Sequence, residues 1–215
     1  MTCPAKGVAI FGGTFDPVHF GHLRSAVEVG EALGVEKVKL IPSCLPPHRD
    51  RPGTTPMQRL EMLRLATRNA DYLEVDEREI AREGKSYMVE TLVSLRKDVG
   101  GRLPLMLVLG HDAWAILDTW HDWRRLTDLA HIVVLDRDGN EPPVVDAVRQ
   151  WSMGKWTEEP VRLRDHASGM ICRMRLTRLD ISATRIREII RTGRSPDYLM
   201  PREVIEYIRQ EQLYR

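Results

Sequence analysis

The chain of 215 residues is long enough for one α/β domain with a buried core, since domains usually run to about 100–200 residues. Lys and Arg number 32 against 31 Asp and Glu, which leaves a net charge of +1. This balance excludes the strongly basic surface of a typical nucleic-acid-binding domain, but it leaves room for a local positive site that binds a small anion.

Cysteine content and apolar runs indicate the kind of environment in which the protein works. The three cysteines, Cys3, Cys44 and Cys172, are scattered and have no CxxC spacing, so we expect neither a disulfide framework nor a cysteine-built zinc site. The first apolar run is too short for a signal peptide, and no run approaches the roughly 18 residues of a membrane span. We therefore expect a soluble, cytoplasmic protein.

The first part of the chain alternates strand-like and helical patterns. Val8–Phe11 is predicted to be a buried strand, and two glycines follow it directly. A helix is expected from about His22 to Leu33, closed by Gly34. Val38–Ile41 is predicted as the second strand, followed by a Pro-rich loop.

The middle of the chain begins with a strong helix start. The sequence Thr55-Pro56-Met57-Gln58 combines a capping box with a proline in the first turn, and apolar residues follow at helical spacing. Ser86 is expected to open another helix, which ends near Gly100. The continuous apolar run Leu105–Leu109 is typical of a central parallel strand.

Beyond this strand the pattern becomes less regular. We predict a Trp-rich helical segment over Ala113–Ala130 and a strand over Ile132–Leu135. Residues from about 140 to 178 lack a clear period, and we expect a less regular insertion there. It should contain a short helix before Trp151 and one late strand near Ile171–Leu176.

Two final helices are predicted over Ser182–Thr192 and Pro201–Gln210. Alternating strands and helices indicate a parallel sheet with helices on both faces. We therefore expect a single domain over residues 1–215, an α/β fold with a doubly wound parallel sheet and a small C-terminal helical part. Ligands of such sheets bind beyond the carboxyl ends of the strands, so the segments after strands are the candidate sites.

The segment FGGTFDPVHFGHL follows the first predicted strand and leads into a helix. Gly12 and Gly13 permit a tight turn and a close approach to a ligand. His19 and His22 are three residues apart, so they share one face at the helix N-terminus, where free N–H groups favour an anion. Imidazole donors there suit a phosphate that gains charge in a transition state. Metal binding by the two histidines, for which no third ligand is evident nearby, and a purely structural glycine turn remain as alternatives.

A second helix start of this kind lies near the C-terminus, in the sequence ISATRIREII. Ser182 is a natural N-cap, and Thr184 lies in the first turn. Arg187 follows about 7.5 Å along the axis, and because helical side chains lean towards the N-terminus, its guanidinium can reach an anion bound at the start of this helix. The alternative is an ordinary capped surface helix with solvated arginines.

Two positions after the central strand are further candidates. Asp112 follows Leu105–Leu109 closely, where a carboxylate suits a ribose hydroxyl or caps the next helix, and the two roles are compatible. Trp120 lies in a stretch that also holds Trp114 and Trp123. Aromatic residues at such spacing usually belong to the core, although a tryptophan face also stacks well on a pyridine ring.

The sequence His19-Phe20-Gly21-His22 resembles the T/H-x-G-H motif of a nucleotidyltransferase superfamily with a Rossmann-like fold. The longer GGTFDPVHFGHL is similar to the bacterial nicotinate-mononucleotide adenylyltransferases, and ISATRIR is similar to the second phosphate motif of that family. The sequence PPHR at 46–49 resembles the family's PPH-K/R loop. The resemblance covers most of the chain and is weakest over residues 140–178.

This resemblance implies roles for particular residues. His22 would be the leading catalytic residue, with His19 and Arg187 beside it. The implied ATP-binding residues are Gly12, Gly13, Thr14, Phe15, His19, His22, Asp112, Arg137, Ser182, Thr184 and Arg187. The implied mononucleotide-binding residues are Asp16, His48, Arg49, Thr91, Trp120 and His121. Among these, the Thr91 backbone would meet the nicotinate carboxylate and the Trp120 ring would stack on the pyridine.

The implied reaction transfers AMP from ATP to nicotinate mononucleotide, with pyrophosphate as the second product. Mg²⁺ would be carried by ATP rather than by a protein site. We expect no nucleic-acid or membrane partner, and a homo-oligomer remains open. The rival functions are a sister adenylyltransferase acting on nicotinamide mononucleotide or phosphopantetheine, a class I aminoacyl-tRNA synthetase, and a non-catalytic nucleotide-binding regulator.

Overall fold

The structure is a computed structural model that describes residues 7–45, 53–82, 84–136 and 144–215. In these parts of the chain, seven strands form one sheet in which all neighbours are parallel, and the order is β3-β2-β1-β4-β5-β7-β6. The strands are β1 (Val8–Gly13), β2 (Lys37–Pro42), β3 (Leu73–Val75), β4 (Leu105–Gly110), β5 (His131–Asp136), β6 (Trp156–Thr157) and β7 (Ile171–Arg175). The predicted parallel sheet is confirmed.

The chain winds outward from β1 in both directions. Ala9 of β1 lies opposite Val38 of β2 on one side and opposite Met106 of β4 on the other. β3 continues the first side, while β5, β7 and β6 continue the second. The connection after β1 leads to β2 on one side, and the connection after β4 leads to β5 on the other side. Between the carboxyl ends of β1 and β4 this leaves a crevice, which is the expected ligand site of a doubly wound sheet.

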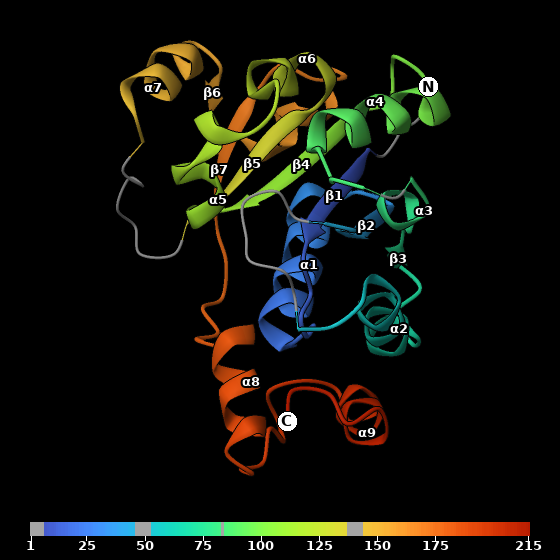
Figure 1. Ribbon diagram of the computed structural model, residues 1–215. Helices are drawn as coiled ribbons and strands as arrows, with labels where there is room; N and C mark the ends of the chain where they lie inside the picture. Colours follow the sequence, from blue (N-terminus) through green and yellow to red (C-terminus); the bar gives the residue numbers. More distant parts are fainter. Residues whose placement is uncertain (1–6, 46–52, 83, 137–143) are drawn as a thin grey trace.

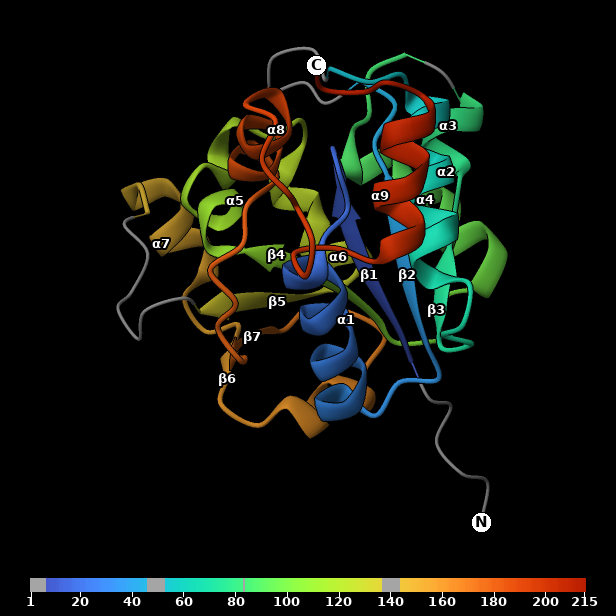
Figure 2. The ribbon, with the colours of Figure 1, turned by 90° about the horizontal axis from the view of Figure 1, so that it is seen from below.

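Helices cover both faces of the sheet (Figures 1 and 2). They are α1 (Phe20–Leu33), α2 (Pro56–Thr67), α3 (Arg78–Arg82), α4 (Met88–Val99), α5 (His111–Ala115), α6 (Leu126–Leu129), α7 (Asp146–Ser152), α8 (Ala183–Arg191) and α9 (Arg202–Gln210). Helices α1, α2, α8 and α9 bury side chains in one core cluster, whereas α4, α5, α6 and α7 do so in a second cluster. Helix α9 packs along α2, and α8 and α9 form the predicted C-terminal helical part.

Local capping signals place several helix ends where the sequence predicts them. The Thr55 side chain accepts a hydrogen bond from the Gln58 N–H at 3.2 Å, and the Gln58 side-chain oxygen accepts one from the Thr55 N–H at 2.9 Å. This reciprocal pair satisfies donors that the first helical turn leaves free. At the end of α1, Gly34 adopts the left-handed conformation with φ of 56°, and its N–H reaches the Glu31 carbonyl at 3.1 Å. Both predictions are confirmed.

The Trp-rich segment Ala113–Ala130 is not the helical stretch that we expected. It holds the short helices α5 and α6, separated by two 3₁₀ turns, Leu117–Thr119 and Trp123–Arg125. Extended backbone at Trp120 and a left-handed residue at Asp122, with φ of 50°, interrupt the helical hydrogen bonds. The hydrophobic pattern of the sequence did not predict either interruption.

Three other details differ from the expectation. The helix expected from Ser86 begins at Met88, with Tyr87 as N-cap, and the Ser86 hydroxyl accepts a hydrogen bond from the Cys44 N–H at 2.8 Å instead. Strand β3 and helix α3 were not predicted, because elements this short contain too few residues to show a period. In the stretch of unclear period, α7 runs through Trp151 and β7 confirms the late strand, while the two-residue β6 was missed.

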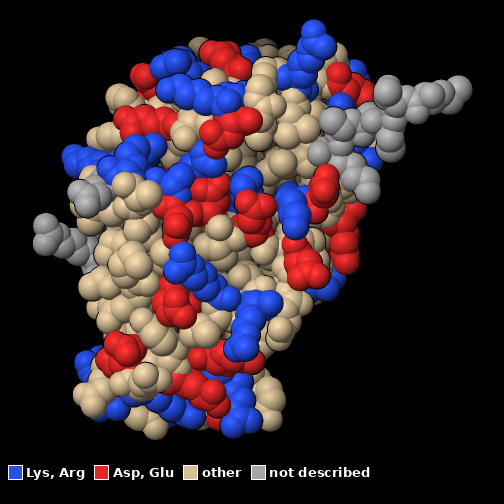
Figure 3. Space-filling view, turned by 90° about the vertical axis from the view of Figure 1, so that its right-hand side faces the viewer, with Lys and Arg blue, Asp and Glu red and all other residues tan. Residues whose placement is uncertain are grey.

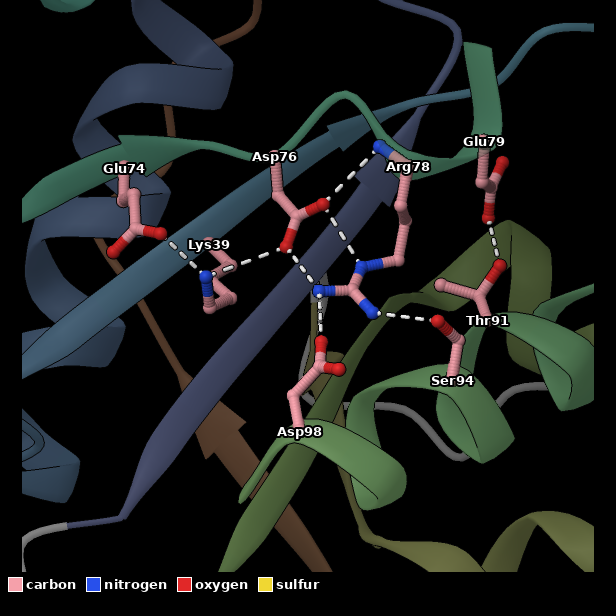
Figure 4. Close-up of polar contacts among 8 residues, drawn as sticks. All are labelled: Lys39, Glu74, Asp76, Arg78, Glu79, Thr91, Ser94 and Asp98. Atoms are coloured by element: carbon pink, nitrogen blue, oxygen red, sulfur yellow. Dashed lines mark hydrogen bonds and ion pairs between the residues drawn. The ribbon is translucent and has the colours of Figure 1, made fainter. Parts of the chain in front are cut away.

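A network of charged side chains binds the outer strands to α3 and α4 (Figure 4). The Asp76 carboxylate accepts two bonds of 2.8 Å from the Arg78 guanidinium and lies 3.3 Å from the Lys39 ammonium. Arg78 also donates to Ser94 at 2.9 Å and to Asp98 at 3.0 Å on α4. Burial alone would raise the pKa of Asp76, but hydrogen bonds from Arg78 and the nearby positive charges lower it. The network therefore joins this edge of the sheet to α3 and α4.

The surface near this network carries both signs of charge. Figure 3 shows Lys and Arg side chains interspersed with Asp and Glu over the side of the molecule where α2, α3 and α4 lie. Within the described residues, no helix is long and apolar enough to cross a membrane.

Candidate active site

The loop between β1 and α1 brings two histidine rings together at a helix start. His19 is the N-cap of α1 and is buried, with 5% exposure, while His22 is the third residue of the helix. The two rings stack with centroids 3.7 Å apart, and the Phe15 ring meets His22 edge-on at 5.1 Å. This packing limits the orientations that both imidazoles can adopt, which is what a preorganised donor pair requires.

A backbone hydrogen bond selects the tautomer of His22. The His19 N–H donates to Nδ1 of His22 at 3.3 Å. In the neutral ring an accepting Nδ1 leaves the proton on Nε2, so we infer from this bond that Nε2 is a donor. The geometry thus equips His22 to donate a hydrogen bond to an anion at the helix N-terminus.

The second predicted segment lies directly against the first, although they are far apart in sequence. Nη1 of Arg187 donates to the Asp16 carbonyl oxygen at 2.7 Å, a bond that spans 171 residues. A Cβ at Gly21, inside the histidine motif, would lie 3.5 Å from the Ile181 carbonyl, one residue before the α8 N-cap. The two helix starts are therefore neighbours in the fold.

The start of α8 is capped in the predicted way. The Ser182 hydroxyl accepts a hydrogen bond from the Arg185 N–H at 3.3 Å. The Thr184 hydroxyl accepts another from Nη2 of Arg187 at 3.2 Å. Arg187 thus bridges the first turn of its own helix and the backbone of the β1–α1 loop, while its side chain stays 35% exposed. An arginine held in this way remains accessible to a phosphate.

A cavity of about 180 Å³ lies beyond the carboxyl ends of β1 and β4. It is lined by Phe11, Gly12, Gly13, Thr14, Ser43, Ser86, Met88, Leu107, Val108, Leu109, Gly110, Ala113, Trp120 and His121. Of the predicted site residues, Gly12, Gly13, Thr14, Trp120 and His121 line it. Position 12 faces the Met88 side chain, since a Cβ there would lie 2.7 Å from the Met88 methyl group and would displace it.

The cavity also contains residues that the sequence did not single out. Ser43 follows β2 directly and Gly110 ends β4, so the rule that ligands bind at strand ends was sufficient to find them. Ser86 and Met88 gave no such signal. They reach the cavity because the start of α4 packs against the end of β2.

The sequence left two roles open for the three central tryptophans: packing in the core and stacking on a pyridine ring. The three residues differ in burial. Trp114 and Trp123 are buried in the core cluster on the α4 side of the sheet. Trp120 is half-buried and lines the cavity. Its neighbour His121 packs on the Tyr87 ring with centroids 4.6 Å apart. An aromatic face is thus available for stacking at Trp120 alone of these three.

Thr91 does not lie where the resemblance implied. Its N–H donates to the Tyr87 carbonyl at 3.2 Å, and its hydroxyl donates to Glu79 at 2.6 Å (Figure 4). Burial raises the pKa of Glu79, although the bond from Thr91 opposes the shift. This structure therefore offers no Thr91 amide to a ligand, because the residue lies inside the helix. The amides without intrahelical acceptors are those of Met88 and Val89 in the first turn.

Five further predicted residues belong to the rest of the site. The Asp16 carboxylate is buried and accepts hydrogen bonds from protein donors, so it faces the protein rather than the cavity. Asp112 is the second residue of α5, exposed, while Gly110 is the N-cap of that helix. His48, Arg49 and Arg137 lie outside the described residues.

The doubly wound sheet carries two phosphate-suited helix starts and a cavity beyond the carboxyl ends of β1 and β4, an arrangement that suits a nucleotide-binding enzyme. A family model described as cytidylyltransferase-like matches residues 10–189. The probable nicotinate-nucleotide adenylyltransferase of Chromohalobacter salexigens is 46% identical over 202 residues, which cover 94% of this chain and 92% of the relative. The corresponding protein of Marinobacter nauticus is 45% identical over 205 residues, or 95% of each chain.

Solved structures agree on the fold. The nicotinic acid mononucleotide adenylyltransferase of Plasmodium falciparum, complexed with NaAD, aligns with a TM-score of 0.72 at 13% identity and covers 97% of each chain. At this identity the likeness concerns architecture alone. On the sequence relationships, the chain belongs to the cytidylyltransferase-like family and, within it, to the nicotinate-nucleotide adenylyltransferases.

Proposed function

We propose that this chain transfers the AMP moiety of ATP to nicotinate mononucleotide, forming nicotinate adenine dinucleotide and pyrophosphate, a step of NAD biosynthesis. The observation that carries the proposal is the bond from Arg187 to the Asp16 carbonyl, which joins the two phosphate-suited helix starts. Two positive helix ends on one side of a triphosphate suit its charge. The names of the full-length relatives support the same reaction.

The reaction depends on the placement of the two substrates more than on proton transfer. A phosphate oxygen of the mononucleotide attacks the α-phosphorus of ATP, and the bond from that phosphorus to the bridging oxygen breaks. Pyrophosphate leaves with the bonding electrons. Because the nucleophile is already an anion, the step needs no general base and no covalent intermediate. His22, with His19 beside it, and Arg187 would stabilise the charge that develops on the reacting phosphoryl group.

The cavity supports an aromatic, acidic acceptor. Trp120 offers a ring face on which a pyridine can stack. The Met88 side chain lines the same cavity, and its N–H belongs to the first turn of α4, where a carboxylate is favoured by free donors and the helix dipole. We therefore assign the carboxylate contact to the amides of Met88 and Val89 in place of Thr91.

A divalent cation would accompany ATP. Among the described residues, no group of three or more His, Cys, Asp or Glu side chains could hold a metal ion. Because Mg²⁺ usually keeps several waters and binds through substrate phosphates, we assign its ligands to phosphate oxygens and water, where the ion would neutralise triphosphate charge. We further propose that the reaction takes place in the cytoplasm, since buried Cys44 and Cys172 are free thiols that suit a reducing compartment.

One assay tests the function. Purified protein is incubated with ATP, Mg²⁺ and one acceptor at a time: nicotinate mononucleotide, nicotinamide mononucleotide or phosphopantetheine. Pyrophosphate release and the dinucleotide product are measured. We expect the highest kcat/KM with nicotinate mononucleotide. A higher kcat/KM with either other acceptor would contradict the proposed substrate, and ATP binding without pyrophosphate release would identify a non-catalytic regulator.

A further inference from the structure

A buried carboxylate lies beneath the β1–α1 loop and is held from two distant parts of the chain. Oδ1 of Asp16 accepts hydrogen bonds from the Thr54 hydroxyl at 2.5 Å and from the Tyr214 hydroxyl at 2.6 Å. The Gly53 N–H reaches Oδ2 at 3.2 Å. Asp16 itself is 6% exposed, so these donors replace the water that its charge would otherwise require.

The backbone of the same residue supports the phosphate side of the site. The Asp16 carbonyl accepts the 2.7 Å bond from Arg187, whose Nη1 also lies 3.8 Å from the Asp16 carboxylate. The preceding residue, Phe15, has a left-handed φ of 52° although it is not glycine. Such a conformation is costly and persists only where surrounding contacts enforce it. The packing of Phe15 on His22 and the hydrogen bonds to Asp16 both hold the loop in this conformation.

A second buried side chain, that of Arg59, also holds the β1–α1 loop. The fully buried Arg59 donates to the Thr14 carbonyl and to the Cys44 carbonyl, each at 2.9 Å. It thus ties the loops after β1 and β2 together. Its charge also lies close to Asp16 and Tyr214. Asp16 itself contacts both Tyr214 and Arg187, and so links the C-terminal segment to the phosphate side.

We propose that Tyr214 is a positioning residue for the transfer reaction: its hydroxyl fixes the Asp16 carboxylate, and the Asp16 carbonyl then orients Arg187 towards the ATP phosphates. This inference rests on the proposed function, because it assigns Arg187 to ATP. Tyr214 would act through Asp16 without touching either substrate.

The tyrosine is suited to this role by its surroundings. Leu213 is buried, and the Tyr214 ring packs within 4 Å of the position that a Cβ at Gly53 would occupy. Burial and the negative charge of Asp16 raise the pKa of Tyr214 well above its usual range. The hydroxyl therefore stays protonated and remains a donor to Asp16 at every working pH.

The first test replaces the tyrosine by phenylalanine. Tyr214→Phe removes the hydroxyl and keeps the packed ring, so we expect kcat/KM for ATP to fall about tenfold, as for the loss of one charge-assisted hydrogen bond. The KM for the acceptor should not change, since Tyr214 is not among the residues that line the cavity with Trp120. Tyr198→Phe, at a side chain that is 93% exposed, is the matched control and should behave as wild type. An unchanged kcat/KM for ATP in Tyr214→Phe would overturn the proposal.

A double-mutant cycle distinguishes a positioning role of Tyr214 from a general loss of stability. If Tyr214 acts through Arg187, Tyr214→Phe should have little further effect in an Arg187→Ala background. Equal losses in both backgrounds would show that the route does not include Arg187 and would overturn the proposal. If Tyr214→Phe fails to fold, Thr54→Val replaces it in the cycle, because it removes the other donor to the same oxygen with little change in shape.

ATP affinity measured by calorimetry distinguishes this inference from the proposed function. A wild-type protein that binds ATP but forms no dinucleotide would contradict the proposed function. The comparison of ATP dissociation constants between wild type and Tyr214→Phe would still test the tyrosine. We expect weaker ATP binding in the variant, and equal dissociation constants in such a protein would overturn the inference.

Discussion

The two ends of the candidate site are built in different ways. At the phosphate end, two helix starts meet, and Arg187 joins them through a single residue, Asp16. At the acceptor end, the cavity lies at strand ends and is lined by glycine backbone and by the side chains of Met88 and Trp120. The first end depends on directional hydrogen bonds between distant segments, whereas the second depends on shape and an aromatic face. Substitutions at the two ends should therefore change different kinetic constants.

The largest effect is expected at the phosphate end, for His22→Ala. Loss of the imidazole donor should lower kcat by roughly 10²–10⁴, which is about 3–5 kcal/mol of transition-state stabilisation. Steady-state kinetics measure the effect, and thermal unfolding verifies that the fold is retained. His166→Ala is the control, since this residue is exposed and its hydrogen bond to His131 is made by the backbone carbonyl, which the substitution keeps. Wild-type turnover in His22→Ala would remove this residue from the mechanism.

A smaller effect at the same end is expected for Arg187→Ala. The change removes a charged donor to phosphate and frees the Asp16 carbonyl, so kcat/KM for ATP should fall by about 10- to 100-fold. The control is Arg191→Ala, one turn further along α8, where the side chain is 62% exposed and pairs with Glu188. If both variants lost activity equally, the special role of Arg187 would be refuted.

At the acceptor end, Trp120→Ala should change a different constant. Loss of the stacking face should raise the KM for the mononucleotide by about 5- to 10-fold, while the KM for ATP stays constant. Trp120→Phe keeps an aromatic face and should recover most of the affinity. A rise in the KM for ATP of the same size as that for the acceptor would show that the two ends are not independent.

The smallest effect is expected away from both ends, at His131, which begins β5. Its Nε2 lies 2.8 Å from the His166 carbonyl, and its Nδ1 accepts a hydrogen bond from the Met170 N–H at 3.1 Å, so the folded protein holds a neutral ring. Burial lowers the pKa of His131 below the ordinary 6.5. The unfolded chain therefore binds this proton more readily, and stability falls as the pH drops below about 6.5.

Urea unfolding at several pH values measures this dependence. His131→Gln provides a side chain that donates and accepts without titrating, so its unfolding free energy should decline less between pH 8 and pH 5.5 than that of wild type. Turnover at pH 8 should be unchanged in the folded variant. Identical pH slopes for the two proteins would contradict the assignment.

Much of the fold could be predicted because its signals are local. A capping box at Thr55 and a glycine at position 34 define helix ends through contacts within one turn. Continuous apolar runs identify the buried strands β1, β2, β4 and β5, since a parallel sheet is covered on both faces. The short elements β3 and α3 were missed because they contain no full period.

In the candidate site, too, the residues that could be predicted are those with a local sequence signal. The histidine motif and the Ser182–Arg187 segment were found because each is a contiguous sequence with its own helix-end chemistry. The interruption at Trp120 and Asp122, which breaks the expected helical segment, left no local signal. Thr91 was assigned by resemblance to a backbone contact that its own helix already occupies.

The sequence by itself determined which residues carry charge, which cap helices and which are apolar enough to form a sheet, because these properties depend on neighbours within about one helical turn. Only the tertiary structure decided that the Asp16 carboxylate faces Thr54 and Tyr214 and that its carbonyl faces Arg187. Such contacts join residues up to 198 positions apart, and their geometry exists only once the strands have paired in order.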